Sequence, residues 1–477
     1  MSVTAGKAAA AASKPIEHHT LERRLGALDA AAIVVSNVIG TGIFIVPAIV
    51  AMMVPTALGM FGVWLLGGVL AFAGAMAYAE LAALRPRAGG EYVYLRDAYG
   101  PIAAFLTGWT SFVAGFSGAI AAGAVGLAEY VGRFLPAAAD RTPIFTIPIP
   151  FAPLVVNPQS IVGITAIVGL SIIHISGLGP GRLVHNVLAS FKVLALVVFV
   201  ALGLSIGDGS FGNWSSSHAV PFPSTGWLLA LIPIMFTYSG WNAAAYVAEE
   251  IRDPGRNLPI ALALGTGAVV VLYLALNALY LYALPMGELA GLGNQRLTDV
   301  VAQRLFGPVA GTMLALLAIV SIAASISAMV LAGPRVYYAM ARDGVFPPIV
   351  ARVHTRFRTP AIAIAIQAIW SSILVLSGTL AGLVSYTGFA VMLFAGVAVM
   401  AVFVLRWRDR GAPRPFSTWG YPLAPALFVF ASLFMVAYSL YANQFGERYG
   451  LAIIFAGLPL YFVFRFWSGR RVRTRTL

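Results

Sequence analysis

The sequence predicts an all-α membrane protein with about twelve transmembrane helices, in which helices 1–5 and 6–10 form a five-plus-five inverted repeat and helices 1 and 6 are broken. Composition supports the membrane assignment, because 60% of the residues are hydrophobic and only 10% are charged. A soluble core of this length cannot bury so much apolar surface, so the solvent must be lipid. In lipid the backbone needs internal partners, and apolar runs of about 20 residues meet that need as helices.

Apolar runs separated by Gly, Pro and charged residues mark the expected spans. They are 27–52, 60–84, 99–134, 158–177, 183–206, 225–249, 259–283, 305–338, 361–378, 381–406, 421–443 and 449–468. The chain divides accordingly into a disordered cytoplasmic N-terminal arm (1–25), a ten-helix inverted-repeat core (26–406), helices 11 and 12 (407–468) and a basic cytoplasmic tail (469–477). The arm has no apolar centre, so we do not interpret it as a signal peptide.

Positive charge is distributed unevenly between the two sides of the expected membrane. With both termini inside, the outer loops keep only Arg133, Arg141, Arg296, Arg304 and Arg448. This asymmetry fits the positive-inside rule and predicts a multi-pass protein of the cytoplasmic (inner) membrane. It also accounts for the net charge of +13 without nucleic acid as a partner. The chain has no cysteine, which excludes disulfides and thiol chemistry.

Two spans contain glycine-rich interruptions near mid-membrane. The first holds Ile39, Gly40, Thr41 and Gly42, and the sixth holds Phe236, Thr237, Tyr238, Ser239 and Gly240. A single such glycine often serves only close helix packing, but paired interruptions in matching positions indicate a transporter binding site. Free N–H groups at a half-helix start suit a carboxylate, and unwound carbonyls suit an ammonium. A zwitterionic α-amino acid carries both groups, so the two breaks predict a site for its head group.

Lys192 lies about ten residues into the fifth span and therefore near mid-bilayer. A charge at that depth costs several kcal/mol, which makes the ammonium easy to deprotonate. Snorkelling to the surface is the alternative, but the depth argues against it. We expect the amine to occupy the place of a bound cation beside the broken helices, with a proton as the switchable charge.

Other polar residues indicate a function less directly. Glu249 and Glu250 at the end of the sixth span, and Glu80 at the end of the second, are expected in surface charge networks. Tyr273 and Ser325 lie inside helices seven and eight, where cavity lining and helix–helix contact are both open. No cluster of metal ligands and no catalytic triad occurs, so the sequence predicts no enzyme, cofactor or metal site.

Several motifs, in order along the chain, resemble the APC superfamily of amino acid, polyamine and organocation transporters. They are 40–44 with Pro47, 89–101, 236–242, 249–259, 335–344 and 358–360. The similarity runs from helix one through helix twelve and is greatest to bacterial relatives of the L-type and cationic amino acid transporters. It implies the twelve-helix fold with the inverted repeat, working by alternating access.

The resemblance also implies roles for individual residues. The substrate carboxylate would meet Thr41 and the N–H of Gly42, and the α-amino group would meet the carbonyls of Val38, Phe236 and Ser239. Phe236 would be the gate over the substrate, Lys192 the helix-five lysine with Ser325 as its contact, and Tyr273 a tyrosine near the site. Ser239 and Asn37 depart from the residues usual in relatives. The cysteine that links animal L-type members to a heavy chain is absent, so we expect no disulfide-linked heavy chain.

Together these observations predict a secondary active transporter of amino acids, proton-coupled or exchanging, and independent of sodium. Neutral L-amino acids are favoured because no acidic residue falls clearly within the core of helices three, eight or ten, and Glu129 lies towards an outer end. A cationic amino acid or polyamine transporter is the alternative; an enzyme, a channel or a non-transporting membrane sensor is more remote. The expected partners are the amino acid substrate, protons and the lipid bilayer, with the chain as a monomer or homo-oligomer.

Overall fold

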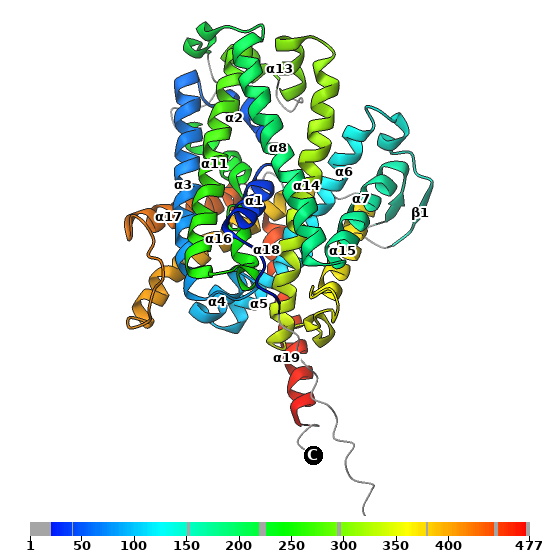
Figure 1. Cartoon of the computed structure of the whole chain (residues 1–477), viewed down its shortest axis with the longest axis vertical. Coiled ribbons are helices and arrows are strands. Elements are labelled where there is room, and N and C mark those ends of the chain that lie inside the picture. The colour runs from blue at the N-terminus through cyan, green and yellow to red at the C-terminus, as the bar shows by residue number, and fades with distance from the viewer. Residues whose placement is uncertain are drawn as a thin grey trace, which may run out of the picture.

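The computed structural model describes residues 21–40, 42–149, 153–218, 226–292, 297–377, 380–442 and 447–473, and these are almost entirely helical (Figure 1). Within them, eight helices are long and apolar enough to cross a membrane, and four shorter apolar helices accompany them. Eight and four make the twelve spans expected from composition. The all-α membrane fold is therefore confirmed.

The first and sixth spans are broken where the sequence predicts. The first consists of α1 (Ala27–Val38) and α2 (Val46–Met53), with a short 3₁₀ turn, η1 (Gly42–Phe44), between them. The sixth consists of α9 (Gly226–Tyr238) and the short α10 (Ala243–Tyr246), followed by η5 (Ala248–Glu250). Thr41 lies outside the described residues, as do residues 1–20 of the expected arm and 474–477 of the tail.

The third span contains a π-helical turn, η2, between two α-helical parts. It runs through α5 (Pro101–Thr110), η2 (Ser111–Gly115) and α6 (Phe116–Val131). The hydroxyl of Tyr337 donates to the carbonyl of Ser111 at 3.2 Å, and the indole of Trp370 donates to that of Val113 at 3.0 Å. Side chains from other helices therefore serve carbonyls in the turn, and π turns of this kind are frequent at functional sites.

The remaining spans are continuous except the last. They are α3 (Ala57–Leu84), α7 (Pro158–Ile175), α8 (Leu178–Ile206), α11 (Pro254–Ala283), α14 (Ala310–Arg342), α15 (Ala361–Leu376), α16 (Leu380–Arg408) and α17 (Leu423–Ala442). The last is divided into α18 (Glu447–Phe455) and α19 (Gly457–Arg473), because Pro459 fits only the first turn of a new helix.

Short elements connect the spans. They are α4 (Glu91–Tyr99), η3 (Pro136–Ala139), η4 (Phe211–Ser215), α12 (Met286–Gly291), α13 (Leu297–Phe306) and η6 (Pro348–Ala351). A small antiparallel hairpin of β1 (Phe145–Ile147) and β2 (Leu154–Val156) lies between α6 and α7, with Phe145 opposite Val156. The sequence did not predict this hairpin.

The broken first span lies at the centre of the bundle. In Figure 1, α1 runs between the long upright helices, and it packs against α8, α11 and α14. Its buried residues extend around the helix, from Ala30 and Ile33 to Val38. The interruption after Val38 is therefore enclosed by protein, which is where irregular backbone is tolerated at membrane depth.

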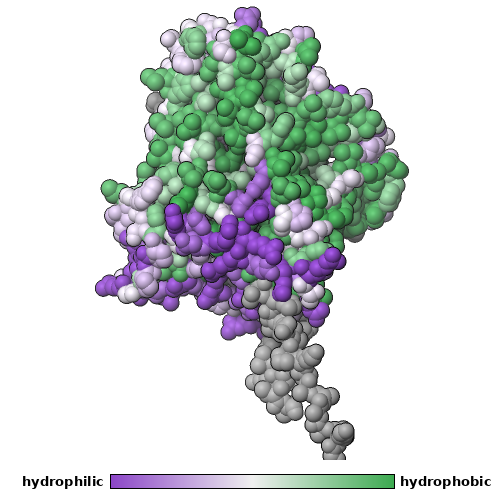
Figure 2. All heavy atoms as spheres, in the orientation of Figure 1, coloured by the Kyte–Doolittle hydropathy of each residue, from purple (hydrophilic) through white to green (hydrophobic). Residues whose placement is uncertain are grey.

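Charged residues gather at one end of the molecule, which we call the arginine-rich end. Figure 2 shows a hydrophilic band there, at the level of α4 in Figure 1, and hydrophobic side chains cover most of the face above it. Its ion pairs join Arg85 with Asp97 and Asp409, Arg96 with Asp343, Arg335 with Glu250, Arg342 with Glu249, and Arg406 with Glu80.

The expectation that Glu80 and Glu250 belong to surface networks is wrong. Their exposed fractions are 2% and 1%. Each carboxylate takes two hydrogen bonds from one guanidinium, Glu80 from Arg406 and Glu250 from Arg335. Bidentate pairing of this kind offsets the desolvation of a buried carboxylate, which is why both can leave the surface.

Candidate functional site

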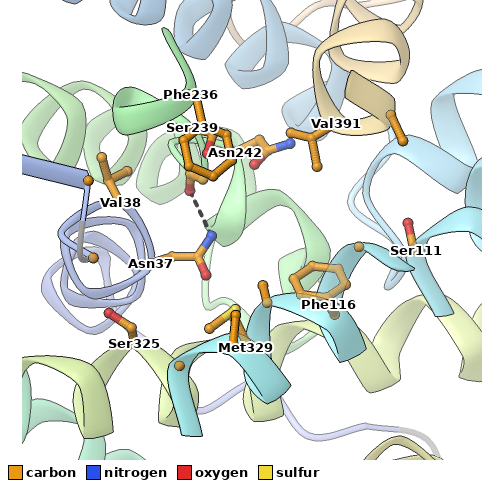
Figure 3. Close-up of a pocket in the computed structure, with 18 of the residues that line it drawn as sticks. Asn37, Val38, Ser111, Phe116, Phe236, Ser239, Asn242, Ser325, Met329 and Val391 are labelled. Carbon is orange, nitrogen blue, oxygen red and sulfur yellow. Dashed lines mark hydrogen bonds between the residues drawn. The ribbon is translucent and has the colours of Figure 1, made fainter. Parts of the chain in front are cut away.

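A cavity of about 260 Å³ lies where the two broken spans meet (Figure 3). The breaks line it with Asn37, Val38, Gly40, Gly42, Phe236, Thr237, Ser239 and Gly240. Its other walls come from the third, eighth and tenth spans, including Ser111, Phe116, Ser325, Met329 and Val391. A small molecule in this space would touch both interruptions at once.

The predicted site residues divide into two groups in the structure. Val38, Gly40, Gly42, Phe236, Thr237, Ser239, Gly240 and Ser325 line the cavity. Ile39, Tyr238, Tyr273 and Lys192 are fully or almost fully buried behind that lining. The second group can support the breaks but does not face the cavity.

Glycine allows the two breaks to approach each other closely. A Cβ atom on Gly42 would lie 2.9–3.2 Å from three side-chain atoms of Thr237. Gly240 has a φ of +100°, and a Cβ atom there would lie 2.5 Å from the Asn37 amide nitrogen. That nitrogen donates to the Gly240 carbonyl at 3.2 Å, the dashed line in Figure 3. A side chain at either glycine would force the two interrupted helices apart.

Tyr273 links the backbones of the two breaks from behind. Its hydroxyl lies 3.0 Å from the Val38 carbonyl oxygen and 3.2 Å from that of Thr237, and it donates to both. The Val38 carbonyl also accepts from the Gly40 N–H at 2.8 Å. These bonds satisfy carbonyls that the end of a helix would otherwise leave without partners.

The backbone N–H of Gly42 has no hydrogen-bond acceptor among the described residues. It lies at the start of η1, on the cavity wall. An N–H group that begins a helical turn favours an anion, since its partial positive charge points outward. The two breaks thus offer a free donor on one side and carbonyl oxygens on the other.

Lys192 joins the end of α1 to α14. Its Nζ donates to the carbonyls of Ser36 and Ile39, at 3.2 and 2.5 Å, and to the Ser325 hydroxyl at 3.0 Å. That hydroxyl also donates towards the same two carbonyls, at 2.8 and 2.9 Å. The amine is completely buried, and the expected Lys192–Ser325 contact is confirmed. It occupies a position where the negative end of a helix favours a cation.

Glu91 also lines the cavity, and it was not predicted because it lies outside the helix cores. Its Oε1 accepts from the Tyr78 hydroxyl at 2.6 Å and from the Asn242 amide at 2.7 Å, and its Oε2 lies 3.5 Å from the Thr107 hydroxyl. Burial raises the pKa of the Glu91 carboxyl, while the hydrogen bonds from Tyr78, Tyr246 and Asn242 oppose that rise. A signal was present in the sequence, because Glu91 is an acidic residue in the motif 89–101 between two apolar spans.

A buried ion pair ties the sixth and eighth spans together at the arginine-rich end, and the segment that leads into α1 bonds to the same glutamate. Arg335 donates from Nε and Nη2 to the two oxygens of Glu250, at 2.7 and 2.9 Å. The backbone N–H groups of Arg24 and Leu25 donate to the Glu250 carbonyl at 2.9 and 3.0 Å. These contacts hold the spans together at that end in this conformation.

Comparison with known proteins gives matches over nearly the whole chain. A family model described as amino acid permease matches residues 25–464. The serine/threonine exchanger SteT of Bacillus subtilis is 30% identical over 449 residues, which cover 94% of this chain and 98% of the relative. The human large neutral amino acids transporter small subunit 2 is 28% identical over 456 residues, which cover 94% of this chain and 81% of the relative. The human b(0,+)-type amino acid transporter 1 is 29% identical over 452 residues, which cover 93% of this chain and 88% of the relative.

Proposed function

The chain belongs to the amino acid permease family, and we propose that it carries neutral L-amino acids by alternating access, driven by protons or by exchange and without sodium. As a member of this family it is a multi-pass membrane transporter of amino acids and not an enzyme. The observation that carries the proposal is the cavity between the two broken helices, which offers a free N–H donor and backbone carbonyls together.

In this proposal the two breaks bind the head group of the substrate. The carboxylate meets the N–H of Gly42 and the Thr41 residue beside it, and the ammonium meets the carbonyls of Val38, Phe236 and Ser239. Support comes from Gly42, whose N–H has no described acceptor. The ammonium would replace or add to the bond that Tyr273 now makes to the Val38 carbonyl.

The backbone around this proposed head-group site belongs to Ile39, Gly40, Thr237, Tyr238 and Gly240. Phe236 is the proposed gate over the substrate. Its side chain lines the cavity and is 38% exposed, although it lies on a helix of the bundle interior. Exposure of a large aromatic ring at the cavity suits a side chain that can swing over a ligand.

Lys192 is the proposed coupling group, with Ser325 as its partner. The amine bonds to carbonyls at the end of α1, where the helix dipole favours positive charge. Loss of its proton would weaken the attachment of α1 to α14 and so link protonation to movement of the first span. An ammonium in this position also removes the need for sodium.

The wall residues favour a neutral side chain. Phe116, Met329, Val391 and Phe394 are apolar, and a charged side chain beside them would lose hydration without gaining a partner. The named substrates of the relatives, serine with threonine and the large neutral amino acids, agree with this choice. A cationic amino acid or polyamine remains the second candidate, because the carboxyl of Glu91 does line the cavity.

We place the protein in the cytoplasmic membrane with the arginine-rich end and both termini inside, following the positive-inside rule. The transport core is proposed as 26–406, with helices 11 and 12 in 407–468. The chain has no cysteine, so a heavy chain cannot be attached through a disulfide. We expect a monomer or a homo-oligomer.

The test is thermal stability of the purified protein in detergent, with each of the common amino acids and several polyamines added in turn. A ligand at about 100 times its Kd stabilises the folded state by about 2.7 kcal/mol. Stabilisation by a group of neutral L-amino acids is the expected result. Stabilisation by arginine, lysine or polyamines alone would overturn the neutral preference and leave the cationic alternative.

A further inference from the structure

Glu91 is a buried carboxyl at the cavity that the proposed head-group site does not use. It begins α4, in the connection between the second and third spans, and its exposed fraction is 6%. Its hydrogen-bond donors are Tyr78 on α3, Asn242 beside α10, Thr107 on α5 and Tyr246 on α10. All four donors are neutral.

The charged groups on the elements around Glu91 are paired with other residues. On α4, Arg96 bonds to Asp97 and Asp343, and on α14, Arg335 bonds to Glu250. The titratable groups that do face the carboxyl are phenols, which belong to Tyr78 on α3, Tyr94 on α4 and Tyr246 on α10. The residues of α16 that line the cavity are Ala390, Val391 and Phe394, and none of them titrates.

In the described part of the chain, therefore, no arginine, lysine or histidine bonds to Glu91. An ionised carboxylate in a site shielded from water is costly unless a cation pairs with it. A proton on the carboxyl neutralises it and so removes the cost of burying a charge. Water that enters the site also lowers the cost of the ionised form, because it solvates the carboxylate.

The two carboxyl oxygens have different surroundings. Oε1 accepts two short hydrogen bonds, at 2.6 and 2.7 Å, whereas the contact of Oε2 with the Thr107 hydroxyl is 3.5 Å long. A threonine hydroxyl can accept a hydrogen bond as well as donate one. The site can thus hold the ionised form, with four donors, or the neutral form, with a proton on Oε2 directed towards Thr107.

The contacts of Glu91 span the parts that must separate when the arginine-rich end opens. Asn242 directly follows the break in the sixth span and also donates to the Tyr246 hydroxyl at 3.2 Å. Thr107 belongs to the third span and Tyr78 to the second. Movement of the sixth span away from the third would take Asn242 from the carboxyl and let water reach it.

We propose that Glu91 binds a proton while the arginine-rich end is closed and releases it when that end opens, so that each substrate released there is accompanied by a proton. On release, the O–H bond of the neutral acid breaks, the proton passes to water, and the carboxylate remains with no other bond changed. The inference rests on the proposed transport function and adds a second proton-binding group, distinct from Lys192.

The experiment compares the full-length wild type with Glu91→Gln in proteoliposomes. Two rates are measured with one neutral amino acid, namely counterflow without a pH gradient and uptake driven by an inward proton gradient. For Glu91→Gln we expect the ratio of gradient-driven uptake to counterflow to fall roughly tenfold relative to wild type, within the 5–150-fold typical of coupling between two sites, whatever the change in counterflow itself. Glu288→Gln is the control, because Glu288 is an exposed carboxylate paired with Arg304 and should leave both rates unchanged.

Equal stimulation by the proton gradient in wild type and Glu91→Gln would overturn the inference. Absence of counterflow in the wild type would instead remove the proposed transport function, and the inference with it. Infrared difference spectra across a pH titration provide an independent readout. We expect the band of a protonated carboxyl that Glu91→Gln lacks.

If Glu91→Gln does not fold, Thr107→Val tests the same carboxyl. Loss of the hydroxyl beside Oε2 should shift both the carboxyl band and the midpoint of its titration. A band identical to that of the wild type would overturn the inference.

Discussion

Gly42→Ala is expected to weaken substrate binding, because the added methyl group pushes the two breaks apart. The new Cβ would lie 2.9, 3.0 and 3.2 Å from the Oγ1, Cγ2 and Cβ atoms of Thr237. Comfortable contacts between such atoms need about 3.5–4.0 Å, so a shift of roughly half an ångström or more is required. Thr237 cannot turn away freely, since its hydroxyl donates to the Pro233 carbonyl at 2.8 Å.

Crowding of this kind costs about 1–3 kcal/mol in a packed interior. If the cost falls on the bound state, affinity drops by a factor of roughly 5 to 150, because about 1.4 kcal/mol corresponds to tenfold. The assay is the KM for uptake in proteoliposomes, together with ligand-induced thermal stabilisation. Gly62→Ala is the matched control, since a Cβ atom at Gly62 would have no atom within 4 Å.

The double variant Gly42→Ala with Thr237→Ala separates crowding from general damage. It removes the two nearest atoms and leaves only the contact at 3.2 Å, so we expect partial recovery of affinity. If Gly42→Ala binds substrate as tightly as Gly62→Ala and the wild type, the placement of the carboxylate at Gly42 is refuted.

Three further predictions concern residues around the cavity. Lys192→Ala should lower the transport rate by about tenfold or more and flatten its pH dependence. The reason is that only the Ser325 hydroxyl would then bond to the carbonyls of Ser36 and Ile39. Uptake that is unchanged at every pH would remove the coupling role of Lys192. Tyr273→Phe should lower the free energy of unfolding by about 1–3 kcal/mol, because it removes the hydroxyl that donates to the carbonyls of Val38 and Thr237. An unaltered KM and melting temperature would contradict this. Burial raises the pKa of the Glu91 carboxyl, so its contribution to stability is present at low pH and lost as pH rises through the folded-state pKa. Glu91→Gln should therefore melt at a less pH-dependent temperature than the wild type, and identical pH profiles would show that Glu91 does not titrate there.

The spans and the two breaks could be predicted because they follow from local composition. Long apolar runs can only be helices in lipid, and the glycine pairs mark the positions where the first and sixth spans unwind. Lys192 could be found for a similar reason, because its depth in an apolar run needed no knowledge of the fold.

Contacts between distant segments could not be predicted in the same way. The sequence places Glu91 outside every expected span. It lines the cavity only because the connection between α3 and α5, which includes α4, folds against the cavity. Arg335 and Glu250 are 85 residues apart, so nothing local to Glu250 shows that its carboxylate is buried. The hairpin of β1 and β2 was hidden by prolines at 148, 150 and 153, which usually argue against strands.

The central claim, that the two breaks recognise both charges of an α-amino acid head group, is tested most directly by counterflow in proteoliposomes loaded with a neutral L-amino acid. The labelled amino acid outside is challenged with three competitors: the same amino acid unlabelled, its decarboxylated amine, and its analogue without the amino group. The account predicts inhibition by the intact amino acid and weak or no inhibition by either analogue. Equal inhibition by an analogue lacking one charge, or no counterflow of any amino acid, would contradict it.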